Sequence, residues 1–370
     1  MRADIGIAVV VAIVAIVACS PSPPSAAPVA SAPSPANAAA AAPSASSSST
    51  STGAVASAVP STSAAPASTE ISPLAARRLL FPTEGDARPR IDACARAEDL
   101  HASVRCMIAL RYEGDAAAAT VAARLYDATG DVAGLEPEGD FDGGWRGQIH
   151  FVPELPVGRY RRHLVDVAAA LEDLERFLDD VRARAPAPVH YRTRDVAFRF
   201  LRSVGRTTPS AFAEHGSVGY NVAGSLLGTA SGVKETLVHE YFHLNDEPAD
   251  ENAEPWSARA LGPIFDGIVA SCGERQPCLA PYAPNDTTVR GGTFYAFQPG
   301  GGPHEYAAEL AVRYVKEVKA RLAAAPPPVV VAAQGARPFK CGPAENARAW
   351  AALVGAFFGG FDPIPGCAAR

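Results

Sequence analysis

The sequence lacks several features that mark common protein classes. Beyond its first residues, no apolar run approaches the roughly eighteen residues that a membrane-spanning helix needs. The net charge is −6, so the basic excess typical of nucleic-acid-binding proteins is missing. No two cysteines show the two-residue gap common in zinc–cysteine sites, and no internal repeat is present. These absences argue against a second membrane span, a nucleic-acid partner and a repeat array.

The one long apolar run lies at the start of the chain. Residues 5–18 are almost wholly apolar, which is short for a bilayer crossing and fits a signal peptide. The run ends in Ile16-Val17-Ala18-Cys19, which resembles the lipobox of bacterial lipoproteins. The resemblance implies a signal peptide over residues 1–19, acylation of Cys19, and a lipid anchor in a membrane of the bacterial envelope, facing the periplasm or the surface. An ordinary signal peptide and an uncleaved anchor are the alternatives.

Composition divides the rest of the chain into two parts. Residues 20–75 are dominated by Ala, Ser, Pro and Thr. Such a segment buries too little apolar surface to offset the entropy of ordering it, so we expect a disordered tether. Residues 76–370 suffice for one large domain or two small ones, and residues 76–200 are a candidate for a separate N-terminal subdomain.

Cysteine usage agrees with export. Apart from Cys19 the chain has six cysteines, which fall into three couples close in sequence: Cys94 and Cys106, Cys272 and Cys278, Cys341 and Cys367. An oxidising compartment favours disulfides. Pairing within each couple is the simplest of fifteen possible connectivities.

Hydrophobic periodicity gives a coarse secondary structure. Apolar residues recur at steps of three and four over residues 158–185, which predicts a long amphipathic helix. The several Gly and Asp of residues 114–147 suggest turns between short elements. We expect a helix over Asp195 to Val204, and the alternation of Val218 to Val222 predicts a strand.

The stretch that carries chemistry is a predicted helix from Val233 to Asn245, with Ser231 as the expected N-cap. It contains His239-Glu240-Tyr-Phe-His243. Because residues four apart lie on the same helix face, His239 and His243 point toward one spot, where two imidazole nitrogens can bind Zn²⁺. Glu240 adjoins the first ligand and can take a proton from a water that the metal activates. The spacing matches the His-Glu-x-x-His pattern of zinc peptidases.

This stretch resembles the active-site helix of the zincin metallopeptidases, and the likeness extends over roughly residues 215–315. It implies an α+β, zincin-like domain with a small mixed sheet, an active-site helix and a mainly helical C-terminal half. It also implies an edge strand that lies along the cleft and pairs with peptide substrate, for which residues 218–222 are the counterpart.

A catalytic zinc needs a third protein ligand and an open position. A ligand ten residues after His239 is excluded because Ala249 stands there. Asp246 shares the helix face and can bind the metal or hydrogen-bond a ligand histidine, and His304 is a minor alternative. Glu305 and Glu309 share one face of a helix predicted over Pro303 to Leu322, which resembles the second zinc helix of the gluzincins. The resemblance implies Glu305 as the ligand and Glu309 as the acid that orients a ligand histidine.

A tyrosine hydroxyl near the metal can stabilise the oxyanion formed on attack. Tyr295 precedes the predicted Glu305 helix in a way that resembles some gluzincins, and Tyr306 is a second candidate. Core packing is the alternative for both.

The sequence therefore predicts a zinc peptidase that acts on peptides or proteins, with Glu240 as general base. The alternatives are a zinc-binding surface lipoprotein without turnover, which binds or senses, and a scaffold in which the motif is coincidental.

Overall fold

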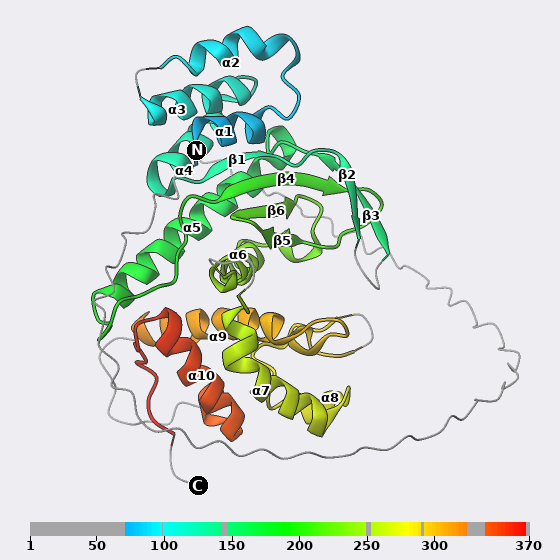
Figure 1. The fold of residues 1–370 in the computed structure, drawn as a ribbon, viewed down its shortest axis with the longest axis vertical. Coiled ribbons are helices and arrows are strands. Elements are labelled where there is room, and N and C mark those ends of the chain that lie inside the picture. Colours follow the sequence, from blue (N-terminus) through cyan, green and yellow to red (C-terminus); the bar gives the residue numbers. More distant parts are fainter. Residues whose placement is uncertain are drawn as a thin grey trace, which may run out of the picture. The chain divides into compact units, whose positions relative to one another are not determined.

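The β structure lies between residues 132 and 221, where short runs carry apolar side chains toward a common core. In the computed structural model, which describes residues 71–367 apart from 98, 143–146, 249–252, 290–291 and 324–336, these runs form one mixed sheet of six strands (Figure 1). The strands are β1 (Val132–Leu135), β2 (Gly139–Asp142), β3 (Gln148–Pro153), β4 (Ala197–Ser203), β5 (Ala211–Glu214) and β6 (Ser217–Asn221).

Strand β4 is the centre of the sheet. It pairs in parallel with β1 and with β6, and its last residues pair antiparallel with β3. Strand β2 continues the sheet beyond β3, and β5 lies antiparallel to β6. The order is β2-β3-β4-β6-β5, so β5 forms one edge.

The two faces of the sheet follow from the period of two along β4. Phe198 and Phe200 lie on one face, where their rings meet Tyr241 of α6 (Ala230–Asp246) and Tyr220 of β6. The opposite face carries α1 (Pro73–Leu80) against β1. Gly134 permits this close approach, because a Cβ there would stand 2.5 Å from the Leu79 carbonyl oxygen.

Helices precede, interrupt and follow the sheet. Before and between the strands lie α1, α2 (Arg88–Cys94), α3 (Leu100–Arg111), α4 (Ala116–Thr129) and α5 (Arg161–Arg182), with the 3₁₀ turns η1 (Gly85–Ala87) and η3 (Gly158–Tyr160). After the sheet come η4 (Ser225–Gly228), α6, α7 (Trp256–Cys272), α8 (Gln276–Leu279), η5 (Tyr295–Phe297), α9 (Pro303–Ala323), η6 (Phe339–Cys341) and α10 (Ala344–Phe357). The described part of the chain is thus a mixed α and β structure with a helical C-terminal half.

Helix α6 connects the two halves. It contacts β5, β6 and α5 on one side and α9 on the other, and α9 packs in turn on α7 and α10. One apolar core extends from Leu80 of α1 to Trp350 of α10. The described residues belong to a single unit, Ala65–Arg370, and residues on both sides of position 200 share its sheet.

The three cysteine couples form disulfides as the simplest pairing predicts. Cys94 is bonded to Cys106, Cys272 to Cys278 and Cys341 to Cys367. Three disulfides indicate that the protein folds in an oxidising compartment.

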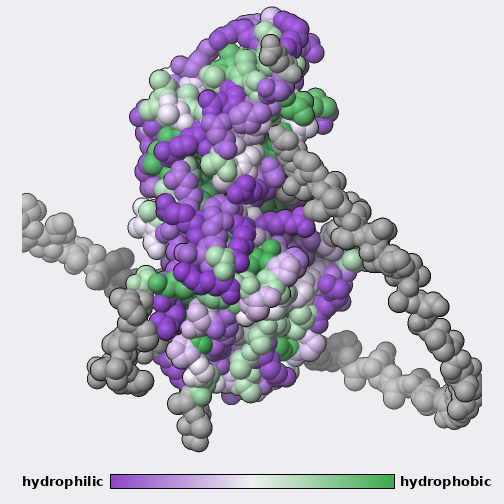
Figure 2. All heavy atoms as spheres, turned by 90° about the vertical axis from the view of Figure 1, so that its left-hand side faces the viewer, coloured by the Kyte–Doolittle hydropathy of each residue, from purple (hydrophilic) through white to green (hydrophobic). Residues whose placement is uncertain are grey.

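None of the described helices has both the length and the apolar character that a bilayer crossing requires. On the face shown in Figure 2 hydrophilic side chains predominate, and apolar ones form small separate patches. The predicted signal peptide, Cys19 and the tether lie outside the described residues.

Several local predictions are corrected. Asp195 to Val204 is not a helix but contains β4, because Phe198 and Phe200 alternate with Arg199. The strand predicted at Val218 to Val222 exists as β6, but it is internal, and its neighbour β5 forms that edge of the sheet. Residues 114–147 contain α4 as well as turns.

The N-cap of α6 also differs from the prediction. It is Thr229, whose Oγ1 accepts from the Gly232 N–H at 3.0 Å, whereas Ser231 donates to Glu235 within the helix. The helices predicted over residues 158–185 and Pro303 to Leu322 are confirmed as α5 and α9.

Candidate metal centre

Two buried tyrosine hydroxyls form hydrogen bonds that hold α6 against the sheet. The Tyr241 hydroxyl donates to Asp131 Oδ2 at 3.2 Å, and the Tyr191 hydroxyl donates to the Val238 carbonyl at 2.8 Å. Asp131, at the start of β1, also accepts from the Val196 N–H at 2.7 Å. These bonds tie the middle of α6 to the sheet, so they set where its opposite face lies.

That opposite face presents His239 and His243 toward α9, which supplies Glu305. The Nε2 atoms of the two histidines are 3.0 Å apart. Glu305 Oε2 lies 3.1 Å from His239 Nε2 and 3.8 Å from His243 Nε2. These three side chains are the group of metal-ligand type found among the described residues.

The triangle has the size that a zinc ion requires. Ligands held at about 2.05 Å in a tetrahedron lie about 3.3 Å from one another. The three observed separations of 3.0, 3.1 and 3.8 Å lie around that value. Two imidazole nitrogens and one carboxylate oxygen also form a donor set of catalytic zinc, which leaves a fourth position open. The residues present therefore fit the metal.

Glu309 determines which nitrogen of His239 faces the site. Its Oε1 lies 3.1 Å from His239 Nδ1, so Nδ1 carries a proton and Nε2 is left as the ligand atom. Asn285 Nδ2 donates to the other oxygen of Glu309 at 3.0 Å and to the Glu309 backbone carbonyl at 2.8 Å. Asn285 thus completes a buried chain that ends at a metal ligand, and no sequence pattern marked it.

Without a metal, the pKa values of the three triangle residues are shifted in different directions. Burial lowers the pKa of His239, but the hydrogen bonds of Glu305 and Glu309 outweigh it and raise that pKa well above its usual value. Burial, with His239 nearby, lowers the pKa of His243 to about 3. Burial opposes ionisation of Glu305, yet its bond to His239 brings the pKa to about 2. At neutral pH without metal, His239 is therefore the charged imidazolium, whereas His243 is a neutral imidazole.

Glu240 lies beside the triangle and lines a pocket of about 790 Å³. Its side chain is nearly buried, and burial raises the pKa of its carboxyl to about 7. A carboxylate with that pKa can both take up and release a proton near neutral pH.

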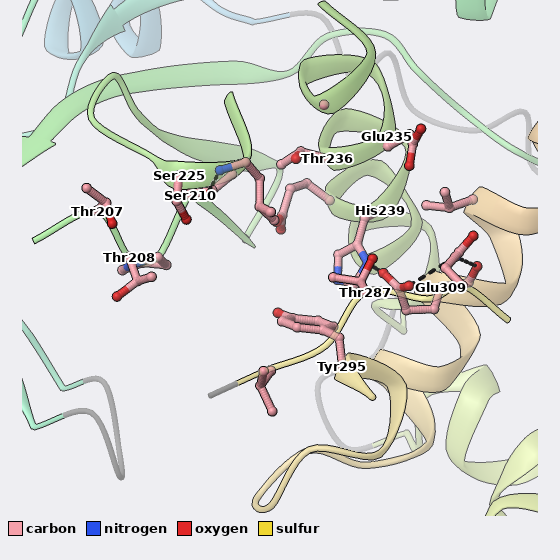
Figure 3. A pocket seen from close by; sticks show the side chains of 18 of the residues that line it. Thr207, Thr208, Ser210, Ser225, Glu235, Thr236, His239, Thr287, Tyr295 and Glu309 are labelled. Carbon is pink, nitrogen blue, oxygen red and sulfur yellow. Dashed lines mark hydrogen bonds and ion pairs between the residues drawn. The ribbon is translucent and has the colours of Figure 1, made fainter. Parts of the chain in front are cut away.

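Tyr295 lies across the pocket from α6 (Figure 3). Its ring meets that of His239 edge to face, with 5.5 Å between centroids. Tyr306 is fully buried against Phe265 and Phe297 and does not line the pocket, so core packing is its role.

The two other candidate ligands lie outside the triangle. Asp246 accepts from the N–H and the hydroxyl of Ser257, so its carboxylate stabilises the start of α7 and does not meet a ligand histidine. His304 is half exposed, and its Nε2 is 4.0 Å from Glu305 Oε1. The prediction of a metal-site role for Asp246 is therefore corrected. Its position three residues after His243 suggested a shared helix face, but α6 ends at Asp246 and the carboxylate bonds to Ser257.

Comparison with protein-family models, with curated proteins and with solved structures found no match to this chain.

The bond between Glu309 and His239 predicts a change in metal affinity. Glu309→Gln removes the charged acceptor that orients His239, so we expect zinc to bind roughly 10- to 100-fold more weakly. Competition with a chromophoric chelator measures this. Glu235→Gln is the matched control, because Glu235 lies on α6 but pairs with Lys316. Equal affinities in the two variants would contradict this role of Glu309.

The raised pKa of His239 predicts that zinc binding displaces a proton. At pH 7 His239 is protonated without metal, whereas His243 and Glu305 are not. Zinc must remove that proton, so its association constant should rise about tenfold per pH unit between pH 6 and 7. Titration calorimetry in buffers of different ionisation enthalpy counts the protons that zinc binding releases. The same measurement on Glu240→Gln excludes protons that come from Glu240. An affinity independent of pH in this range would show that His239 is neutral beforehand.

Proposed function

We propose that this protein is a zinc-dependent peptidase with a zincin-like fold. The observation that carries the proposal is the convergence of His239, His243 and Glu305 from two helices on one point, with Glu240 beside them. A structural zinc site has four protein ligands, whereas this donor set leaves one position for water or substrate.

Two acids on α9 support one type of zinc site. Glu305 and Glu309 lie one turn apart, the first in the triangle and the second bonded to His239 Nδ1. This division between ligand and orienting acid supports the gluzincin type. The antiparallel edge strand β5 next to α6 supports the zincin comparison, because an extended peptide can pair with such an edge.

The residues around the metal suit hydrolysis of a peptide bond. Zinc, when bound, would polarise the substrate carbonyl and lower the pKa of water. Glu240 accepts the proton of the attacking water on a carboxylate oxygen and then donates it to the leaving amine nitrogen. Tyr295 lines the same pocket and contacts the His239 ring, which supports a role in donating a hydrogen bond to the carbonyl oxygen as negative charge develops there.

Zinc content and cleavage, measured together, test this proposal. We expect about one zinc per chain by elemental mass spectrometry and cleavage of unfolded proteins or peptides. Glu240→Gln should keep the zinc and lower kcat by roughly 10²- to 10⁴-fold, because only proton transfer is removed. Glu305→Ala should lose tight zinc binding, whereas Asp246→Asn should retain it.

Two results would refute the proposal in different ways. A folded protein without zinc would show that the motif is coincidental. Zinc binding without cleavage of any peptide would favour the alternative of a binding or sensing lipoprotein.

We also propose that the protein is exported and lipid-anchored through Cys19. The three disulfides support export, and the sequence Ile16-Val17-Ala18-Cys19 supports acylation. In bacteria that express the full chain, the protein should incorporate a labelled fatty acid. The Cys19→Ser variant should not incorporate it. Equal labelling of both would contradict the anchor.

A further inference from the structure

Several hydroxyl-bearing residues line the pocket beside Glu240. Figure 3 shows one group at the end away from His239 and another around it. The far end carries Thr207, Thr208, Ser210 and Ser225, and the near end carries Thr236 and Thr287. Thr236 and His239 are three residues apart on α6 and share its face, so the Thr236 hydroxyl lies within a turn of the metal triangle.

The near end also holds an oriented amide. Asn285 is only 7 % exposed, and its Nδ2 donates to two oxygens of Glu309. Those oxygens can only accept hydrogen bonds, so Nδ2 must face Glu309. The amide oxygen Oδ1 then points away from Glu309. Thr236 is 8 % exposed, and both residues line the pocket, so the buried part of its wall carries an amide and a hydroxyl.

The charges that line the pocket are largely compensated. Glu309 pairs with His239, and Glu235 pairs with Lys316 at 3.0 Å. Arg206 lies at the exposed end of the lining. Since Glu240 is required for proton transfer, no lining carboxylate remains free to bind a basic side chain, and Glu240 itself repels an acidic one.

We propose that this pocket selects an uncharged polar side chain, an amide or a hydroxyl, on the substrate residue next to the cleaved bond. This inference rests on the proposed peptidase function. An apolar side chain would cover Thr236 and Asn285 without giving them hydrogen-bond partners, which is the condition under which a site rejects an analogue strongly. Val289 and Val312 contact the carbon atoms of whichever side chain enters.

Peptide sequencing tests the preference directly. The zinc-loaded full-length protein is incubated with a peptide mixture randomised at both positions that flank a central bond, and the products are sequenced by mass spectrometry. At one of these positions Gln, Asn, Ser and Thr should exceed Leu, Phe, Lys and Glu by at least tenfold in kcat/KM.

Three substitutions assign the preference to the pocket. Thr236→Val keeps the shape and removes the hydroxyl, so the ratio of Gln to Leu should fall about tenfold. Thr236→Ser should restore the ratio. Thr120→Val, on the exposed side of α4 and outside the pocket, should leave both the ratio and the total rate unchanged.

The outcomes separate the inference from the function on which it rests. Zinc-dependent cleavage that favours Leu or Phe, or a charged residue, at both positions overturns the selectivity alone. An unchanged Gln to Leu ratio in Thr236→Val also overturns it. If no peptide in the mixture is cleaved, the peptidase function and the selectivity both fail.

Discussion

The contact between α6 and α9 is the constraint on which the site depends. Two of the three ligand side chains come from α6, and the third comes from α9 with the acid that orients His239. A carboxylate as buried as Glu309 is tolerated because His239 and Asn285 both donate to it. The same bonds that satisfy this charge therefore fix the separation and rotation of the two helices.

The rest of the fold holds that pair of helices in place. Asp131 precedes β1 and Tyr191 precedes β4. Both form hydrogen bonds with the side of α6 that faces away from the metal site. The described residues before α6 contribute no ligand; they hold α6 in place and form one wall of the pocket. The edge position of β5 next to α6 leaves one side of the pocket open to an extended chain.

The sequence was most informative where chemistry requires a fixed spacing. His239, Glu240 and His243 follow from the helical period, and so do Glu305 and Glu309 once α9 is recognised. Asp246 fits the same period but meets Ser257 instead, because periodicity cannot show where the chain turns after the helix. Strand β4 was mistaken for a helix because an element of seven residues satisfies either period.

Other parts of the site carry no signal in the sequence. Asn285 and Asp131 act through partners 24 and 110 residues away, and a single Asn or Asp is common in loops. The edge strand β5 is partly exposed throughout and shows no alternation, so its place beside α6 depends on tertiary structure.

X-ray absorption at the zinc edge of the purified protein tests the central claim most directly. The account predicts about one zinc per chain, with two imidazole ligands and oxygen at about 2.0–2.1 Å. Sulfur at about 2.3 Å, a third imidazole, or no zinc in the folded protein would contradict it.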